Sequence, residues 1–402
     1  MIDTQKELFL KNCKNTYLTD LTENILPFWL ENGMDNIHGG LYTCLDRIGK
    51  KMDSTKSVWF QGRFAYVLAY AYNHIKPNAE WLIASKNCID FLERHCFDEQ
   101  GHMYFEVMCD GTPLRKRRYV FSECFTIIAM AEYAKASKDE IYAKKAFDLL
   151  MYVLDILGNE SILPSKYLDT VKMRGHSITM ILINTAMCVR QVYSDAKIDT
   201  LIMNNISDLE NYFINEEYQA LLETVGENGE FIDTIIGRTI NPGHSIETAW
   251  FLMEVAQSFT QDKKRIENLA LKILDWSWKW GWDEKFGGII NFKDCKGFPA
   301  QDYSQDMKFW WPQCESMIAT LYAYKITKDE KYLDMFKLAH EWAYTYLVDS
   351  EHREWYGYLH RDGSVAQPAK GNIFKGPFHI PRMMVKCHEL CTEILSNNQI
   401  TN

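Results

Sequence analysis

Ionisable side chains cluster in six short segments of the chain, and their types are suited to proton transfer. The segments read WFQGR, FSE, RGHS, NPGHSIE, WWPQCE and KGPFHIPR, and they contain Arg63, Glu123, His176, His244, Glu247, Glu315, His379 and Arg382. His244 lies three residues before Glu247, and His379 lies three residues before Arg382, so each pair shares one face of a helix. Burying this many ionisable groups is costly unless they pair or act, which favours a catalytic site over separate helix caps.

Two neutral imidazoles on opposite sides of a substrate could move a proton away from a carbon atom and back. The N-terminus of a helix carries partial positive charge, which disfavours imidazolium, so we expect His244 and His379 to be neutral bases at about pH 7. One imidazole would remove a proton next to a carbonyl, and the other would return a proton to the opposite face. Arginine and other donors would stabilise the enediolate oxygen. This chemistry inverts a carbon stereocentre without a metal or a redox cofactor.

Two other interpretations of the same residues stay open. Glu247 and Glu315 could serve as the acid and base of an inverting glycoside hydrolase, which needs two carboxyl groups set apart to admit a water. A non-catalytic helical scaffold could instead use the polar residues to bind a peptide. The neighbouring aromatic residues would be ordinary core in a scaffold, or would stack on the C–H faces of a sugar in an enzyme; they are Trp59, Phe309, Trp310 and Trp311.

An internal repeat of about 65 residues places these segments at equivalent positions. A hairpin pattern, with alternating strand residues around a glycine turn, recurs with its turn glycines at Gly49, Gly111, Gly229, Gly297 and Gly363. One interval is about two periods long, so we expect a degenerate hairpin near residues 164–169. A long helical pattern follows each hairpin, and these patterns begin near Trp59, Phe121, Gly175, Gly243, Pro312 and Phe378.

The repeating unit is a helix, a short turn, a second helix and a long hairpin loop, with residues 3–32 supplying the sixth outer helix. Helices after the long loops, such as SITMILINTAMCV, are apolar nearly all round, which is typical of helices buried on both sides. The other helices carry a charged face. This favours a closed barrel over an open solenoid, whose terminal repeats would need polar caps. We therefore predict an all-α fold, an (α/α)6 barrel of six helical hairpins with short β-hairpin loops on one rim.

No linker rich in Pro, Ser or Gly divides the chain, so we expect residues 1–402 to form a single catalytic domain. The long loops all precede the inner helices and collect on one rim, over the N-termini of those helices. Binding and catalytic residues are most often held on loops over a rigid frame. We therefore expect the functional site on that rim.

Composition and charge argue against several classes of function. The 402 residues are 47% hydrophobic and 14% aromatic, as in a well-packed globular protein. A net charge of −10 argues against a nucleic-acid binder and against binding to anionic membranes. The N-terminal segment lacks the basic start and apolar run of a signal peptide, and no apolar stretch is long enough to span a bilayer. Eleven scattered cysteines favour reduced thiols, no metal site and a cytoplasmic location.

Four segments resemble the hallmark segments of the N-acylglucosamine 2-epimerases, also called renin-binding proteins. They read KSVWFQGR, NPGHSIETAWFL, FWWPQCESMIA and KGPFHIPR, and the hairpin GGLYTCLDRIGK is similar too. The resemblance runs in order from about Phe28 to Cys387, nearly the whole chain. It implies an isomerase with an (α/α)6 barrel that interconverts N-acetylglucosamine and N-acetylmannosamine.

The resemblance also implies roles for individual residues. His244 and His379 resemble the two acid/base histidines of the family. Substrate-contacting or histidine-orienting positions are matched by Arg63, Glu247, Glu315 and Arg382, while polar pocket positions are matched more loosely by His176 and Asn184. We also expect Trp59 and Trp311 to line the substrate site.

The resemblance implies a small sugar as substrate and no cofactor required for the chemistry. Some N-acyl epimerases respond to ATP, so ATP is a candidate allosteric activator, although no GxxxxGK[ST] motif occurs. Family members are often dimers, which makes a homodimer an expectation; renin binding belongs to animal relatives and is not carried over. Cellobiose or mannose 2-epimerases and aldose–ketose isomerases stay open as alternatives, but the QGR and NPGH segments look more like the N-acyl group.

Overall fold

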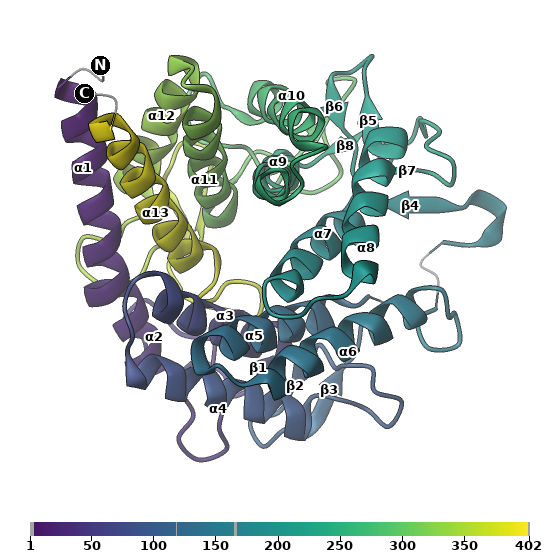
Figure 1. The fold of residues 1–402 in the computed structure, drawn as a ribbon, viewed down its shortest axis with the longest axis vertical. Helices are drawn as coiled ribbons and strands as arrows, with labels where there is room; N and C mark the ends of the chain where they lie inside the picture. Colours follow the sequence, from purple (N-terminus) through teal and green to yellow (C-terminus); the bar gives the residue numbers. More distant parts are fainter. Residues whose placement is uncertain (1–3, 118, 165–166, 401–402) are drawn as a thin grey trace.

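The computed structural model describes residues 4–117, 119–164 and 167–400, and its helices form two concentric rings (Figure 1). The inner helices are α3 (Val58–His74), α5 (Phe121–Ser137), α7 (His176–Arg190), α9 (Pro242–Ser258), α11 (Trp310–Thr327) and α13 (His379–Ile400). The outer helices are α4 (Ala79–His95), α6 (Glu140–Leu157), α8 (Ala196–Asp208), α10 (Lys263–Gly281), α12 (Glu330–Tyr346) and α1 (Thr4–Thr19). Each inner helix packs against the next, and α13 packs against α3, which closes the inner ring. The predicted (α/α)6 barrel is confirmed.

The helix positions follow from the sequence pattern. All six inner helices begin within two residues of their predicted starts. Inner helix α5 is buried along nearly its whole length, whereas outer helix α10 buries one face. Four outer helices begin at side-chain caps that accept backbone N–H groups, each worth roughly 1 kcal/mol; the caps are Asn78, Asp139, Asp195 and Asp329.

The two ends of the chain close the barrel together. Helix α1 continues through a π-helical turn (Asp20–Ile25) into α2 (Leu26–Asn32), and α1 packs against α13 (Figure 1). The opening segment is thus the sixth outer helix, as predicted. Within the described residues no helix combines the length and apolar character needed to cross a membrane. All eleven cysteines lie in the described ranges, and none is in a disulfide.

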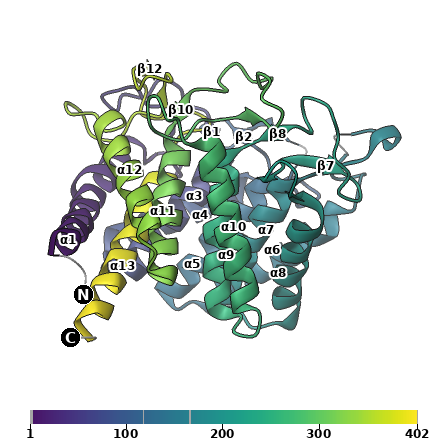
Figure 2. The ribbon, with the colours of Figure 1, turned by 90° about the horizontal axis from the view of Figure 1, so that it is seen from above.

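The long loops and their short strands lie together on one rim of the barrel (Figure 2). Most strands pair between neighbouring loops rather than within one loop: β1 (Lys56–Ser57) with β2 (Glu106–Val107), β4 (Met173–Gly175) with β7 (Thr224–Gly226), β8 (Thr239–Ile240) with β9 (Lys293–Asp294), and β10 (Lys308–Phe309) with β11 (Tyr358–Leu359). The strands β3 (Pro113–Arg115) and β12 (Val365–Gln367) extend two of these sheets, and β5 (Ile214–Asn215) pairs with β6 (Ala220–Leu221). This pairing ties adjacent repeats to each other above the inner helices.

The predicted turn glycines have the expected backbone geometry. Their φ values lie between 80° and 93°, a conformation that favours glycine, at Gly49, Gly111, Gly229, Gly297 and Gly363. The degenerate hairpin predicted near residues 164–169 includes residues 165 and 166, which lie outside the described ranges. The chain after them forms a 3₁₀ turn (Asp169–Val171) and then β4, whose partner is β7 of the following loop.

Buried lysines hold three of the long loops in place, a feature that the sequence pattern did not indicate. Lys56 Nζ lies 2.7 Å from Asp35 and 2.6 Å from the carbonyl of Gly39. Lys370 repeats this arrangement with Asp349, and Lys308 repeats it with Asp283. Removing one member of a buried pair leaves an uncompensated charge, so these pairs keep the loops above the barrel in one arrangement.

Candidate active site

A cavity of about 730 Å³ opens among the long loops, at the N-terminal ends of the inner helices. This is the rim on which we expected the site, and the volume is typical of a small-molecule pocket. Eight predicted site residues line the cavity: Trp59, Arg63, Asn184, His244, Glu247, Trp311, His379 and Arg382. The neighbouring aromatic residues Phe309 and Trp310 line it too, as expected.

The two candidate catalytic histidines both lie next to one indole ring, that of Trp311. The Trp311 ring centroid is 5.2 Å from that of His244 and 5.8 Å from that of His379. The centroids of the two imidazole rings are therefore no farther apart than the sum of these two distances. His244 stands in the first turn of α9, whose cap Asn241 accepts its backbone N–H at 3.1 Å. His379 is the first residue of α13, so both rings are held by helix starts from distant parts of the chain.

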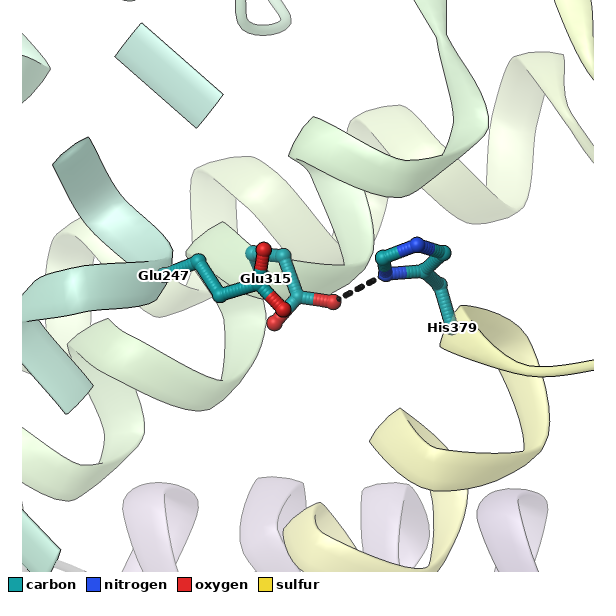
Figure 3. A group of neighbouring side chains, drawn as sticks. All are labelled: Glu247, Glu315 and His379. Carbon is teal, nitrogen blue, oxygen red and sulfur yellow. Dashed lines mark hydrogen bonds and ion pairs between the residues drawn. The ribbon is translucent and has the colours of Figure 1, made fainter. Parts of the chain in front are cut away.

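His379 is held at its Nδ1 atom by a buried carboxylate. Nδ1 lies 2.7 Å from Glu315 Oε1, and Figure 3 shows the two side chains facing each other. The other Glu315 oxygen accepts the Trp250 indole N–H at 2.8 Å. Burial and the nearby Arg382 guanidinium hold the pKa of His379 well below its usual value, which favours the neutral imidazole. A neutral ring that donates Nδ1–H to Glu315 keeps its basic lone pair on Nε2.

His244 also has a carboxylate at Nδ1, but its pKa shifts in the opposite direction from that of His379. Glu223 Oε1 and Oε2 lie 3.1 and 3.2 Å from His244 Nδ1. Burial lowers the pKa of His244, but the charge and hydrogen bond of Glu223, with a contribution from Glu247, raise it overall above its ordinary value. The carboxylates thus outweigh burial, and the surroundings of His244 favour its charged form more than those of His379 do.

Arg382 pairs with two buried carboxylates beside the cavity. Its Nη2 atom lies 2.5 Å from Glu247 and 2.7 Å from Glu315. Glu247, Glu315 and His379 (Figure 3) place one potential metal-ligand atom each within 4.8 Å of one another. The Arg382 guanidinium already pairs with an oxygen of each carboxylate, which disfavours a metal ion at this position.

Arg63 brings a cation to the cavity wall without a partner. Its guanidinium lies 4.0 Å from the Phe125 ring centroid and 4.7 Å from that of Phe378. In the described part of the chain, Nε has no hydrogen-bond partner and no carboxylate lies within ion-pairing distance. Burial lowers the pKa of Arg63 to about 9, which still leaves it charged at neutral pH. Arg63 is therefore free to receive an oxyanion.

Comparison with known proteins places this site in a family. Residues 40–377 match the sequence profile of the N-acylglucosamine 2-epimerase family. The chain belongs to this family. It is therefore a sugar 2-epimerase, an enzyme of the isomerase class. The N-acylglucosamine 2-epimerase of Bos taurus is 32% identical, over 93% of this chain and 90% of that protein. The cellobiose 2-epimerase of Dictyoglomus turgidum is 22% identical, over 94% of this chain and 98% of that protein.

Solved structures share the fold of this N-acylglucosamine 2-epimerase family member. Cellobiose 2-epimerase from Bacillus thermoamylovorans superposes with a TM-score of 0.83 at 20% identity, covering 94% of this chain and 99% of that one. A D-mannose isomerase superposes with a TM-score of 0.71 at 21% identity, covering 97% and 98%. At this level of identity the similarity concerns the barrel itself.

Three predicted residues do not lie in the epimerase cavity. Glu315 is fully buried behind His379 and does not line the cavity. His176 is also fully buried, with Nε2 3.0 Å from Thr248 Oγ1 and Nδ1 3.4 Å from Glu223. Glu123 instead pairs with His102 Nδ1 at 2.6 Å in an outer loop. A helix start fixes a residue's height in the barrel, but its angular position decides whether it reaches the axis.

Asn184 lines the epimerase cavity as predicted, and its other side borders a second cavity. A smaller cavity of about 200 Å³ lies at the other ends of the inner helices, and Asn184 lines both cavities.

The residue that sequence analysis missed is Glu223, which stands in the loop between β6 and β7 rather than at a helix start. Its only sequence signal is an acidic residue in the otherwise apolar strand region LLETV.

Proposed function

We propose that this enzyme interconverts N-acetylglucosamine and N-acetylmannosamine by removing and returning the proton at C2. The observation that carries the proposal is the pair of imidazoles, His244 and His379, that line one cavity and both lie next to Trp311. Each imidazole is oriented by a carboxylate at Nδ1, which leaves Nε2 for the substrate. This arrangement supports proton transfer on two faces of one carbon atom.

The chemistry starts from the open-chain sugar, whose C1 aldehyde acidifies the C2 proton. One imidazole takes that proton, the C2–H bond breaks, and its electron pair moves into a C1–C2 double bond and onto O1. Arg63, whose guanidinium lies at the cavity wall, stabilises the resulting enolate oxygen. The other histidine then gives a proton to the opposite face of C2, which forms the new C2–H bond and inverts the centre.

The substrate assignment rests on the relatives. The more similar curated relatives are named N-acylglucosamine 2-epimerases, and the relatives named cellobiose 2-epimerases are less similar. A glycoside hydrolase on the same barrel is disfavoured because Arg382 pairs with both Glu247 and Glu315. That pairing leaves neither carboxyl group free to protonate a leaving group.

Proton NMR of the purified enzyme with N-acetylmannosamine in deuterated water tests the proposal. The C2 proton signal should disappear while N-acetylglucosamine appears, and cellobiose should be unchanged. Epimerisation of cellobiose without any change in N-acetylmannosamine would move the enzyme to the sister activity. Release of a free sugar from a glycoside would instead show a hydrolase.

Four further properties are proposed, the first three on the family resemblance and the cytoplasmic location on the scattered cysteines. ATP acts as an allosteric activator, which repeating the NMR assay with and without ATP checks. The chemistry needs no metal, so treatment with a chelator should leave the rate unchanged. The protein forms a homodimer and is located in the cytoplasm. Light scattering of the purified protein measures its oligomeric state.

A further inference from the structure

A closed hydrogen-bond network surrounds Glu223 behind His244. Glu223 contacts His244 Nδ1 through both carboxylate oxygens, and its Oε1 lies 3.4 Å from His176 Nδ1. The His176 backbone N–H donates to the Glu223 carbonyl at 3.0 Å. Thr248 Oγ1 lies 3.0 Å from His176 Nε2 and donates to the His244 carbonyl at 2.9 Å. The network therefore fixes the carboxylate against the first turn of α9.

The two carboxylates that hold the histidines differ in their partners. Glu315 pairs with Arg382 as well as with His379, so a permanent cation offsets its charge. In the described part of the chain, Glu223 forms ion pairs with His176 and His244 alone and with no lysine or arginine. A carboxylate without a permanent cation favours the charged form of the imidazole beside it. A carboxylate at Nδ1 therefore favours the charged imidazole more strongly at His244 than at His379.

The groups that face His244 come from every neighbouring element. They are Glu247 on α9 itself, Glu223 from the β6–β7 loop, His176 from α7, His379 from α13 and the neutral ring of Trp311 from α11. The two carboxylates favour an imidazolium at His244, and the two other histidines oppose it only when they are protonated. Arg382 offsets part of the charge of Glu247, so Glu223 is the carboxylate beside His244 that has no lysine or arginine partner among the described residues.

We propose that Glu223 is a positioning residue that makes the two histidines unequal, so that His244 rests as the imidazolium and His379 as the neutral base. This inference rests on the proposed C2 epimerisation. Starting from the resting enzyme, the C2 proton passes to His379 Nε2, the electron pair moves to O1, and His244 Nε2 then protonates the opposite face. The product leaves His379 protonated and His244 neutral, and exchange of protons with solvent restores the resting state.

The test replaces Glu223 by Gln, which keeps the shape of the side chain and removes its charge. In a profile of kcat/KM against pH, the alkaline limb should move down by at least about one pH unit, because His244 loses its proton earlier. The acidic limb, which reports His379, should stay in place. NMR titration of the His244 imidazole in isotope-labelled protein should show the same shift without any substrate. An alkaline limb and a His244 titration that both stay in place would overturn the inference.

Two companion variants separate this role from a structural one. Glu223→Asp keeps the charge and should restore most of the alkaline limb. Glu123→Gln removes a buried carboxylate that pairs with His102 on the same rim and does not line the cavity, so it should leave the pH profile unchanged. If the wild-type enzyme exchanged no C2 proton of N-acetylmannosamine, the proposed function would fall. The substrate-free His244 titration would still decide the role of Glu223.

Discussion

Arg382 Nη2 lies 2.7 Å from Glu315 Oε1, the oxygen that also contacts His379 Nδ1 at 2.7 Å. One carboxylate oxygen therefore serves the histidine and the arginine together. The guanidinium offsets the charge of Glu315 while the geometry still orients the imidazole. Glu315 therefore orients the His379 imidazole without favouring its protonated form, and a buried base requires both properties.

Replacing Arg382 with Met should destabilise the protein strongly. Glu247 and Glu315 would then be buried without a cation, and breaking a buried pair from one side costs about 3–5 kcal/mol. Urea unfolding measures the loss. The exposed pair between Arg353 and Glu31 provides the control, since Arg353→Ala should change the unfolding free energy by less than about 1 kcal/mol. Equal effects of the two variants would contradict the assigned role of Arg382.

Replacing either His244 or His379 with Ala should remove epimerisation at C2. A positioned acid or base contributes about 10²–10⁴-fold to the rate, and inversion in a two-base mechanism needs both groups. The measurement is conversion of N-acetylmannosamine into N-acetylglucosamine by proton NMR, with circular dichroism to show that the fold survives. His360→Ala, an exposed histidine in a long loop, is the matched control and should epimerise normally. Normal epimerisation in His244→Ala or His379→Ala would refute the two-base mechanism.

Replacing Arg63 with Met should separate activity from stability. The loss of the oxyanion partner should lower kcat by about 10²–10³-fold. The free energy of unfolding should not fall, because Arg63 has no ion-pair partner among the described residues and its buried charge is itself costly. Steady-state kinetics and urea unfolding of the same preparation give both quantities. A variant that unfolds more easily yet keeps its kcat would show that Arg63 is structural.

Acid should destabilise the protein through His340, a residue outside the active site. Burial lowers the pKa of His340 to about 4, and its Nδ1 lies 2.8 Å from the Tyr17 hydroxyl. A histidine with a depressed pKa stabilises the fold above the unfolded pKa of about 6.5 and loses that contribution as the pH falls towards its folded value. Between pH 7 and pH 4 the loss should be about 3 kcal/mol.

The comparison of wild type with His340→Gln isolates this contribution. Glutamine still offers Tyr17 a hydrogen-bond partner but does not titrate in this range. The unfolding free energy of the wild type, relative to that of the variant, should therefore fall as the pH falls from 7 to 4. A difference that stays constant over this range would exclude His340 as a source of acid sensitivity.

Local patterns in the sequence were enough to predict the barrel. The repeat of hairpin glycines and the contrast between apolar and amphipathic helices placed every inner helix start within two residues. These features depend on backbone preferences and on burial of one helix face, which neighbouring residues determine. The common rim of the long loops then placed His244, His379 and Arg63 in one cavity.

Only the tertiary structure decided which charges meet. Arg382 and Glu247 are 135 residues apart and Glu223 and His244 are 21 apart, and no local pattern links either pair. His176 and Glu123 share the helix-start position of the other site residues but turn away from the cavity. The sequence by itself therefore determined the barrel and the height of each polar side chain within it. The packing of the helices around the axis decided their partners and charge states, because ionisation depends on neighbours within a few ångströms that the fold brings together.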